Sequence, residues 1–334
     1  MADLRVGKVP NDVLRRIVYG HLGERDPSVI LGPNVGEDAA LLDHGGRILA
    51  FKSDPITGSV EEVGALAVYV NANDIATRGA KPRWFLQCIL LPEGSSSADL
   101  KRIISQIDEA AKELGVSIVG GHTEVTRGIS RPIVVGSMIG TLPNSRFFTS
   151  AGAHADDVLC MTKGAGIEGT VILSSEGEVR KELGEGFVKS TKGLRRLINV
   201  VPECLALSAL EGVTSMHDLT EGGVMGGAWE LAEAASLGVE LDLSSVPIMG
   251  ETKRLCRVLS LDPYRLISSG SIIFTVKPGA ERAAEDALSD ISVPSSRIGR
   301  MVPLKEGRKY RDLRGRLRLL SPPSSDELWK GIWH

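Results

Sequence analysis

A polar stretch rich in small residues, Asn144–Asp157, divides this chain of 334 residues into two halves. A chain of this length exceeds what one hydrophobic core normally holds, because single cores stop growing at roughly 250–300 residues. On both sides of the stretch, segments with helical periodicity alternate with short apolar runs that are typical of strands. The sequence therefore predicts two α/β domains at residues 1–148 and 149–334, each an α+β arrangement in which helices cover a sheet.

Glycines mark the ends of the two most clearly periodic segments of the first half. Gly79 and Gly115 follow helices predicted over about 60–78 and 98–114, because glycine readily adopts the left-handed conformation at a helix end. The other predicted elements of this half are a helix over 11–21 and strands at 39–42, 47–52, 83–91, 116–119 and 132–140. In the second half we expect helices over 166–175, 202–210, 222–237 and 279–288, and strands at 158–162, 238–241 and 271–276.

Composition excludes several classes of function. The 39 Lys and Arg residues against 42 Asp and Glu residues give a net charge of −3, which exerts no pull toward nucleic acid or an anionic membrane. Aromatic residues make up only 4% of the chain, too few for large base-stacking platforms. The 4 cysteines are scattered, which is typical of buried thiols in a reduced compartment. The first residues lack an apolar signal core, so we expect a cytoplasmic protein.

Carboxylates occur at two places where the first predicted strands begin or end. Glu37 and Asp38 follow a glycine and precede an apolar run, and Asp54 ends the next strand. Hard cations such as Mg²⁺ bind carboxylate oxygens together with phosphate oxygens and water. An acidic turn and an ordinary Asp-Pro turn explain the same residues, so the pattern alone leaves both interpretations open.

A third polar group lies inside the helix predicted over 60–78. Asn71, Asp74 and Arg78 fall on one face at helical spacing. Asn73 also lies mid-helix, where asparagine has a poor propensity, and the alanines between these residues indicate close packing. Buried polar groups need partners, and a metal–phosphate group would supply them. Solvent exposure of this face is the equally simple alternative.

The segment Gly120–Glu124 is a candidate phosphate-binding loop. Its paired glycines let the backbone approach a phosphate closely and offer amide donors. His122 and Glu124 have the chemistry of metal ligands or of acid–base groups. A histidine beside a glycine turn is more often structural, so this segment alone does not establish a catalytic role.

In the second half, Asp218 and Glu221 precede the glycine pair that opens the helix predicted over 222–237. A helix N-terminus attracts anions through its free amides and its dipole. The simpler alternative is a capping arrangement in which Thr220 is the N-cap and the two acidic groups only favour the dipole.

In chain order, these motifs resemble the aminoimidazole ribonucleotide (AIR) synthase-like superfamily. This superfamily includes AIR synthase, selenophosphate synthetase, thiamine-monophosphate kinase and the hydrogenase-maturation protein HypE. The similarity extends from about Val13 to Val302, and its most specific part is Asn73–Pro82. The glycine-rich segment Thr162–Thr170 looks most like HypE and its relatives.

The resemblance implies a two-domain fold, a ligand set and roles for particular residues. N-terminal domains would pair across a dimer axis into a β-barrel-like core, with ATP in a cleft between domains and Mg²⁺ on the acidic motifs. The metal ligands would be Glu37, Asp38, Asp54 and Asp74. Cofactor-binding residues would be Asn71, Asn73, Gly120, Gly121, His122, Thr123 and Glu221, and catalytic residues Asp74, Glu124 and Asp218.

Two departures from the family pattern concern the Gly120–Glu124 segment and the end of the chain. His122 stands where the family has an acidic residue, and Glu124 stands where HypE has lysine. Either His122 replaces the acidic metal ligand or Glu124 holds the metal, and the preference of Mg²⁺ for oxygen favours Glu124. No cysteine follows Cys256, so we expect that transfer of a carbamoyl group to a C-terminal cysteine, as in HypE, is not available here.

The function that the resemblance implies is an ATP- and Mg²⁺-dependent enzyme that phosphorylates an oxygen of a small substrate. In HypE and AIR synthase that oxygen is of the amide type. The alternatives are a phosphotransferase that acts on a phosphate oxygen, as thiamine-monophosphate kinase does, and a nucleotide-binding scaffold without catalysis. We expect a homodimer that binds a small-molecule substrate and neither nucleic acid nor membrane, with a maturation partner protein as a further candidate.

Overall fold

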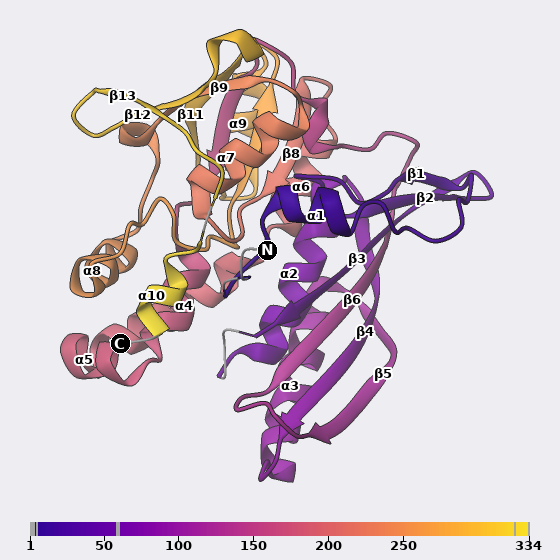
Figure 1. Ribbon diagram of the computed structural model, residues 1–334, viewed down its shortest axis with the longest axis vertical. Coiled ribbons are helices and arrows are strands. Elements are labelled where there is room, and N and C mark those ends of the chain that lie inside the picture. Colours follow the sequence, from indigo (N-terminus) through magenta and orange to yellow (C-terminus); the bar gives the residue numbers. More distant parts are fainter. Residues whose placement is uncertain (1–3, 5, 58–60, 324, 333–334) are drawn as a thin grey trace.

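The computed structural model describes residues 4, 6–57, 61–323 and 325–332. The described strands form two separate sheets with helices packed against them, and this mixed α/β architecture confirms the predicted fold class (Figure 1). The predicted boundary after residue 148 falls between the last strand of the first sheet and the first strand of the second. Among the described residues, no helix combines the length and the apolar character that a membrane span requires.

The first sheet has the strand order β1-β2-β3-β6-β4-β5, and helices α2 and α3 cover one of its faces (Figure 1). Only the β4–β5 pair is parallel. The strands are β1 (Val29–Leu31), β2 (Ala40–His44), β3 (Arg47–Ile56), β4 (Lys81–Pro92), β5 (Ser117–Thr126) and β6 (Ile133–Thr141), and the helices are α1 (Asn11–Ile17), α2 (Val63–Thr77) and α3 (Ser97–Leu114). Val60, at the predicted start of α2, lies outside the described residues.

The second sheet has the strand order β13-β12-β9-β11-β7-β10-β8. Its strands are β7 (Val158–Thr162), β8 (Val213–Asp218), β9 (Gly238–Asp242), β10 (Ile272–Val276), β11 (Ser295–Val302), β12 (Arg308–Arg311) and β13 (Leu317–Leu319). The helices of this part are α4 (Ile167–Ser174), α5 (Gly177–Thr191), α6 (Val201–Ser208), α7 (Gly223–Ala234), α8 (Gly250–Leu259), α9 (Glu281–Asp290) and α10 (Leu328–Ile332).

The prediction that Gly120–Glu124 forms a loop is wrong, because all five residues belong to strand β5. The paired glycines suggested a loop, but here they allow two strands to approach each other. Gly121 has φ 156°, and a Cβ atom at this position would lie 2.1 Å from the carbonyl oxygen of Gln87 on β4. Next to this contact the β4–β5 register shifts, as at a β-bulge.

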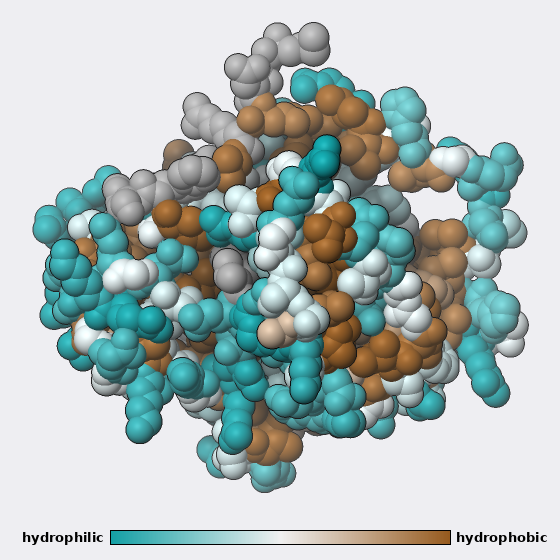
Figure 2. All heavy atoms as spheres, turned by 90° about the horizontal axis from the view of Figure 1, so that it is seen from below, coloured by the Kyte–Doolittle hydropathy of each residue, from teal (hydrophilic) through white to brown (hydrophobic). Residues whose placement is uncertain are grey.

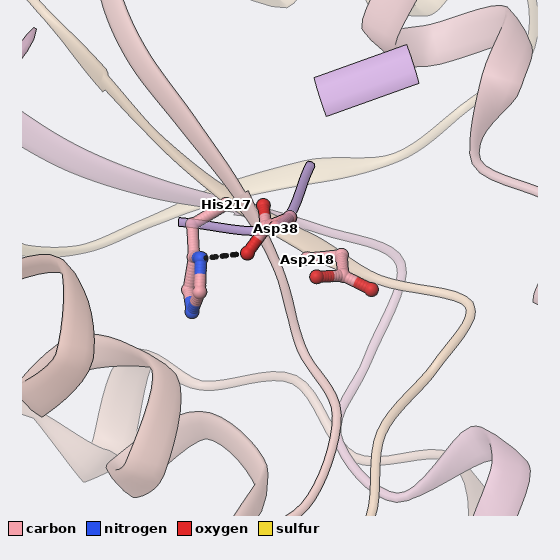
Figure 3. A group of neighbouring side chains, drawn as sticks. All are labelled: Asp38, His217 and Asp218. Atoms are coloured by element: carbon pink, nitrogen blue, oxygen red, sulfur yellow. Dashed lines mark ion pairs between the residues drawn. The ribbon is translucent and has the colours of Figure 1, made fainter. Parts of the chain in front are cut away.

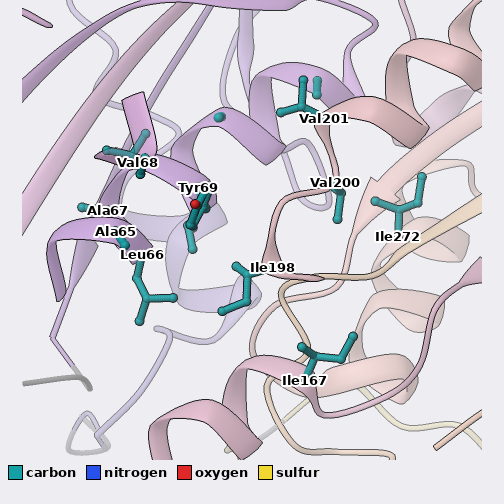
Figure 4. Packing of buried hydrophobic residues seen from close by; sticks show 14 of the residues in the cluster. Ala65, Leu66, Ala67, Val68, Tyr69, Ile167, Ile198, Val200, Val201 and Ile272 are labelled. Carbon is teal, nitrogen blue, oxygen red and sulfur yellow. The ribbon is translucent and has the colours of Figure 1, made fainter. Parts of the chain in front are cut away.

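Helix α2 is buried along its whole length, because the first sheet lies on one side of it and the second domain on the other. A single hydrophobic cluster extends from α2 into the second domain, where Ile198, Val200 and Ile272 continue it (Figure 4). A helix that is apolar on all sides is the expected solution for such a central position.

The two asparagines of α2 bind backbone groups. Asn73 accepts a hydrogen bond from Val200 N at 2.9 Å and donates one to Ile198 O at 2.8 Å, so it joins the two domains. Asn71 accepts a hydrogen bond from Asp54 N at 2.9 Å and fixes the end of β3. Both amides therefore have structural partners, and their predicted contact with a cofactor remains untested.

We predict that Asn73→Ala lowers the free energy of unfolding by about 2–4 kcal/mol, because it leaves two buried backbone groups without partners. Urea denaturation followed by circular dichroism measures this change. Asn144→Ala is the matched control, since Asn144 is exposed and bonds only to the nearby Arg146 amide. A loss of stability no larger than that of the control would contradict the bridging role of Asn73.

Candidate functional site

A cavity of about 540 Å³ lies between the two domains and receives side chains from both. From the first domain it is lined by the segment before β2, by the end of β3 and by α2. From the second domain it is lined by the end of β8, the first turn of α4 and helix α10. Most of the acidic residues predicted from the sequence meet here, namely Glu37, Asp38, Asp54, Asp74, Asp218 and Glu221.

Arg78 organises the first-domain side of this site. Its guanidinium group is fully buried and pairs with the carboxylates of Glu37 and Asp38. It also donates a hydrogen bond to Met216 O on β8 at 3.1 Å, so the same group contacts the second domain. Burial opposes the charge of Arg78, but the carboxylates of Asp38 and Glu37 raise its pKa. The arginine therefore remains charged in the interior.

Glu37 is used mainly as a structural group. One of its carboxylate oxygens accepts hydrogen bonds from Arg78 and from Ser150 N, and the other accepts one from Ala151 N at 3.2 Å. These contacts tie the segment before β2 to the start of the second domain. A role for Glu37 in metal binding remains a prediction.

Asp38 and His217 form a buried ion pair, with His217 Nδ1 2.7 Å from Asp38 Oδ1 (Figure 3). The other ring nitrogen of His217 lies 3.4 Å from Glu230 Oε2. Burial alone would lower the pKa of His217, but the two carboxylates raise it to about 10. His217 is therefore protonated at neutral pH, and it supplies a positive charge instead of a lone pair for a metal.

Lys52 lies among several carboxylates on the opposite wall of the cavity. Its Nζ atom is 3.2 Å from Asp54 Oδ2 and 3.1 Å from Asp74 Oδ2. Burial alone would lower the pKa of Lys52, but Asp74 and Asp54 raise it above its ordinary value. One lysine therefore serves two carboxylates, and Asp218 adds a third negative group nearby.

Asp74 and Asp218 carry negative charge that the chain itself does not fully balance. Each is almost completely buried. Asp74 Oδ2 contacts Lys52 Nζ, whereas Asp218 Oδ2 has no hydrogen-bond partner among the described residues. Burial, together with the charge of Asp218, raises the pKa of Asp74 well above its ordinary value. Burial, together with Asp38, raises the pKa of Asp218 to about 6. Buried carboxylates that share one lysine beside an open cavity fit the oxygen preference of Mg²⁺.

Comparison with known proteins identifies the family. Residues 36–142 match the N-terminal domain of AIR synthase related proteins, and residues 154–310 match their C-terminal domain. The chain belongs to the AIR synthase related protein family. It is 32% identical over 254 residues to the carbamoyl dehydratase HypE of Rhodobacter capsulatus, which covers 74% of this chain and 72% of that protein.

Solved structures of this family have the same fold. The crystal structure of HypE from E. coli is 26% identical, covers 92% of this chain and 95% of its own, and has a TM-score of 0.74. A HypE in complex with ATP is 23% identical, covers 97% of this chain and 98% of its own, and has a TM-score of 0.72. At the latter identity the likeness establishes the fold alone.

The glycine-containing motif of β5 lies away from the cavity in this single chain. Gly120, Gly121, His122, Thr123 and Glu124 are exposed, and none of them is among the cavity-lining residues. His122 Nε2 lies 3.1 Å from Glu124 Oε2 on the surface. The family resemblance grouped these residues with the acidic motifs, but one copy of the chain does not bring them together.

The predicted anion site at the N-terminus of α7 is occupied by side chains of this protein. Gly222 N donates a hydrogen bond to Asp326 Oδ2 at 2.6 Å. Glu221 accepts a hydrogen bond from Lys8 N at 2.6 Å. Segments near the two ends of the chain therefore cover this helix end, and Glu221 contributes to the cavity wall from there.

Several residues of the site were missed by reasoning from the sequence. Lys52 and His217 were not selected, because a lysine inside a strand and a single histidine carry no recognisable spacing. Glu168 was not selected either, because a single acidic residue at the start of the helix predicted over 166–175 carries no recognisable spacing. The sequence signal for Glu168 was its position between Gly166 and Gly169. Glycines at these positions permit close packing of a neighbouring loop.

We predict that Asp218→Asn raises the melting temperature of the metal-free protein at pH 8 by about 3 °C. The folded-state pKa of Asp218 is raised to about 6, so its destabilising effect grows as pH rises from about 4 through 6 and is complete above that. Asparagine removes this effect, so the gain should vanish near pH 4. Differential scanning calorimetry in a chelating buffer measures it.

The control for this measurement is Asp108→Asn, which changes an exposed carboxylate paired with Lys112 at the surface. Its melting temperature should stay close to that of the natural protein at both pH values. A destabilised Asp218→Asn protein at pH 8 would show that the Asp218 charge is balanced in the metal-free state.

Proposed function

We propose that this protein is an ATP- and Mg²⁺-dependent enzyme that phosphorylates an amide-type oxygen of a small substrate. The observation that carries the proposal is the pair of buried carboxylates, Asp74 and Asp218, which line the interdomain cavity close to a single lysine, Lys52. The relatives support it, since a HypE is known in complex with ATP and others are named carbamoyl dehydratases.

Asp54, Asp74 and Asp218 are the residues that would hold Mg²⁺. When bound, the ion would reduce the charge of the triphosphate during transfer of its terminal phosphoryl group. Lys52, which lies beside Asp54 and Asp74, would offer its ammonium group to phosphate oxygens. Asp38 is already paired with His217 and Arg78, so it would act by positioning the segment before β2.

The charge of the cavity favours an amide-type substrate over a phosphate ester. Among the described residues that line it, the only lysines are Lys8 and Lys52, and both pair with carboxylates. A phosphate monoester would bring two further negative charges close to Glu168, Asp218 and Glu221. A neutral or positively charged substrate avoids this repulsion. This observation weighs against the kinase alternative.

A second copy of the chain would bring the β5 motif into the site. In the parallel β4–β5 pair, His122 lies beside Cys88 and Glu124 beside Leu90, so both point to the face of the sheet that α2 and α3 leave open. Apolar side chains such as Trp84, Leu86 and Ile139 are half-exposed on this face. Figure 2 shows exposed hydrophobic residues on the side of the molecule where the first sheet lies.

We infer that two such faces pack together and form the barrel-like core of a homodimer. An exposed sheet face with apolar residues of this size is a typical subunit interface. Pairing would carry Glu124 of each copy toward the cavity of the other. The active site would then consist of Asp54, Asp74 and Asp218 from one copy and the β5 motif from its partner.

We predict that Asp74→Asn weakens Mg-ATP binding at least tenfold while the protein remains folded, because a ligand charge is lost and the shape is kept. Isothermal calorimetry with and without Mg²⁺ measures the affinity. The natural protein should release ADP when supplied with small carboxamides. Unchanged Mg²⁺-dependent affinity in the folded variant would remove Asp74 from the site, and ADP release with phosphate monoesters alone would favour the kinase alternative.

Mixing two inactive variants tests the shared site. In a mixture of Asp74→Asn and Glu124→Gln proteins that exchange subunits freely, about one quarter of all sites contain neither substitution. We therefore predict recovery of about one quarter of the Mg-ATP binding sites, counted by calorimetry. No recovery after confirmed subunit exchange would contradict a site built from two copies. Full binding by Glu124→Gln alone would point to His122, which His122→Asp then tests.

A further inference from the structure

Part of the cavity wall that the second domain contributes is apolar. Its apolar side chains are Ile172, Ile267, Leu328 and Trp329, and the acidic residues Asp218 and Glu221 line the same cavity. Two polar side chains interrupt this part of the wall, Glu168 from the first turn of α4 and Ser269 from the loop before β10. This part has the composition of a small-molecule pocket, apolar with a few placed polar groups.

Glu168 is buried, and one of its oxygens has no partner in the chain. The residue is 3% exposed, and its Oε2 atom makes no hydrogen bond. Ser269, which is 1% exposed, lies next to this carboxyl: its hydroxyl acts on Glu168 as a hydrogen-bond donor, and it has no other partner among the described residues. Buried polar atoms are usually hydrogen-bonded, and exceptions that face a cavity are candidates for ligand contacts.

The backbone around Glu168 is held firmly, so its position is not accidental. Gly166 begins α4 in the left-handed conformation with φ 73°, and Gly166 N donates to Ser268 Oγ at 2.7 Å. A Cβ atom at Gly169 would lie 2.4 Å from Leu266 Cγ, so only glycine allows the loop 266–269 to pack here. The glycines that frame Glu168 in the sequence therefore bring Ser269 to the same part of the cavity wall.

The charges around Glu168 are negative. The charged groups that act on it most strongly are Asp326, Glu221 and Asp218, all of them acids. Burial raises the pKa of Glu168 to about 7, and a positive charge beside the carboxyl would favour its ionised form. Lys8 and Lys52, the lysines among the described lining residues, are already paired with other carboxylates.

We propose that Glu168 anchors the substrate through a cationic nitrogen group, such as an amine, amidine or guanidine, at this part of the cavity wall. The inference rests on the proposed function, since it assigns the substrate-binding part of that same site. A group with several N–H donors would meet two acceptors, Glu168 Oε2 and Ser269 Oγ. The carbon skeleton of the substrate would lie against Ile172 and Ile267, and its reacting oxygen would face the residues that would hold Mg²⁺.

Ligand-observed NMR with three small probes of similar shape tests the proposal. Acetamidinium carries a cationic nitrogen group, acetamide is its neutral counterpart, and acetate carries a negative charge. Saturation-transfer titrations of each probe are made on the full-length protein in the presence of Mg-ATP. We expect acetamidinium to bind at least tenfold more tightly than acetamide, with no measurable binding of acetate.

Two variants and one control locate the binding. Glu168→Gln, which keeps the shape of the side chain, should weaken acetamidinium binding at least tenfold. Ile172→Phe should weaken it by narrowing the pocket without changing charge, and it keeps the test decisive if Glu168→Gln does not fold. Glu178→Gln, an exposed change on the neighbouring helix α5, should leave binding unaltered.

Calorimetry separates this inference from the proposed function. Glu168→Gln should bind Mg-ATP as the natural protein does, because Glu168 is not among the residues that would hold Mg²⁺. Equal affinity of acetamidinium for natural protein and folded Glu168→Gln would overturn the assignment of Glu168. Tighter binding of acetamide or acetate than of acetamidinium would overturn the cationic class. If the natural protein did not bind Mg-ATP, that result would instead overturn the proposed function.

Discussion

The fold of this protein depends on one buried positive charge, the guanidinium group of Arg78. A fully buried arginine is tolerated only when carboxylates surround it, because an isolated charge in the interior is very costly. Glu37 and Asp38 provide that surrounding, and the bond to Met216 O extends it into the second domain. Helix α2, the segment before β2 and strand β8 are thereby fixed relative to one another, and the interdomain cavity lies where they meet.

This arrangement divides the acidic residues into two classes. Asp38 and Glu37 are neutralised by Arg78 and His217, so they hold the structure. Asp74 and Asp218 lie near Lys52, and burial together with neighbouring carboxylates raises the pKa of both. Cation-binding sites commonly contain excess negative charge, because the bound ion neutralises it. The same two carboxylates therefore lower the stability of the metal-free protein and favour the binding of a cation.

The first sheet carries the β5 motif, which the proposed site requires, on its exposed face. The motif of β5 lies on the open face of the sheet, beside apolar side chains that would otherwise be covered by a helix. The proposed dimer would account for both features together, since it would cover the apolar face and would bring Glu124 to a cavity. The glycine pair is needed because β5 approaches β4 closely there, where Gly121 contacts the backbone of Gln87.

The sequence by itself determined the two-domain α/β fold, most helices of the first half and the acidic residues that meet in the cavity. These follow from local patterns, namely apolar periodicity, glycine ends and carboxylates beside strands. Only the tertiary structure decided which polar residues bind each other. Asn73 bonds to backbone atoms 125 and 127 residues away, which its position in a helix does not indicate. Glu168 was not selected from the sequence, yet it is buried beside the cavity, because the loop 266–269 packs on the glycines that flank it. Such pairings join residues that are remote in the chain, and no spacing within one segment can reveal them.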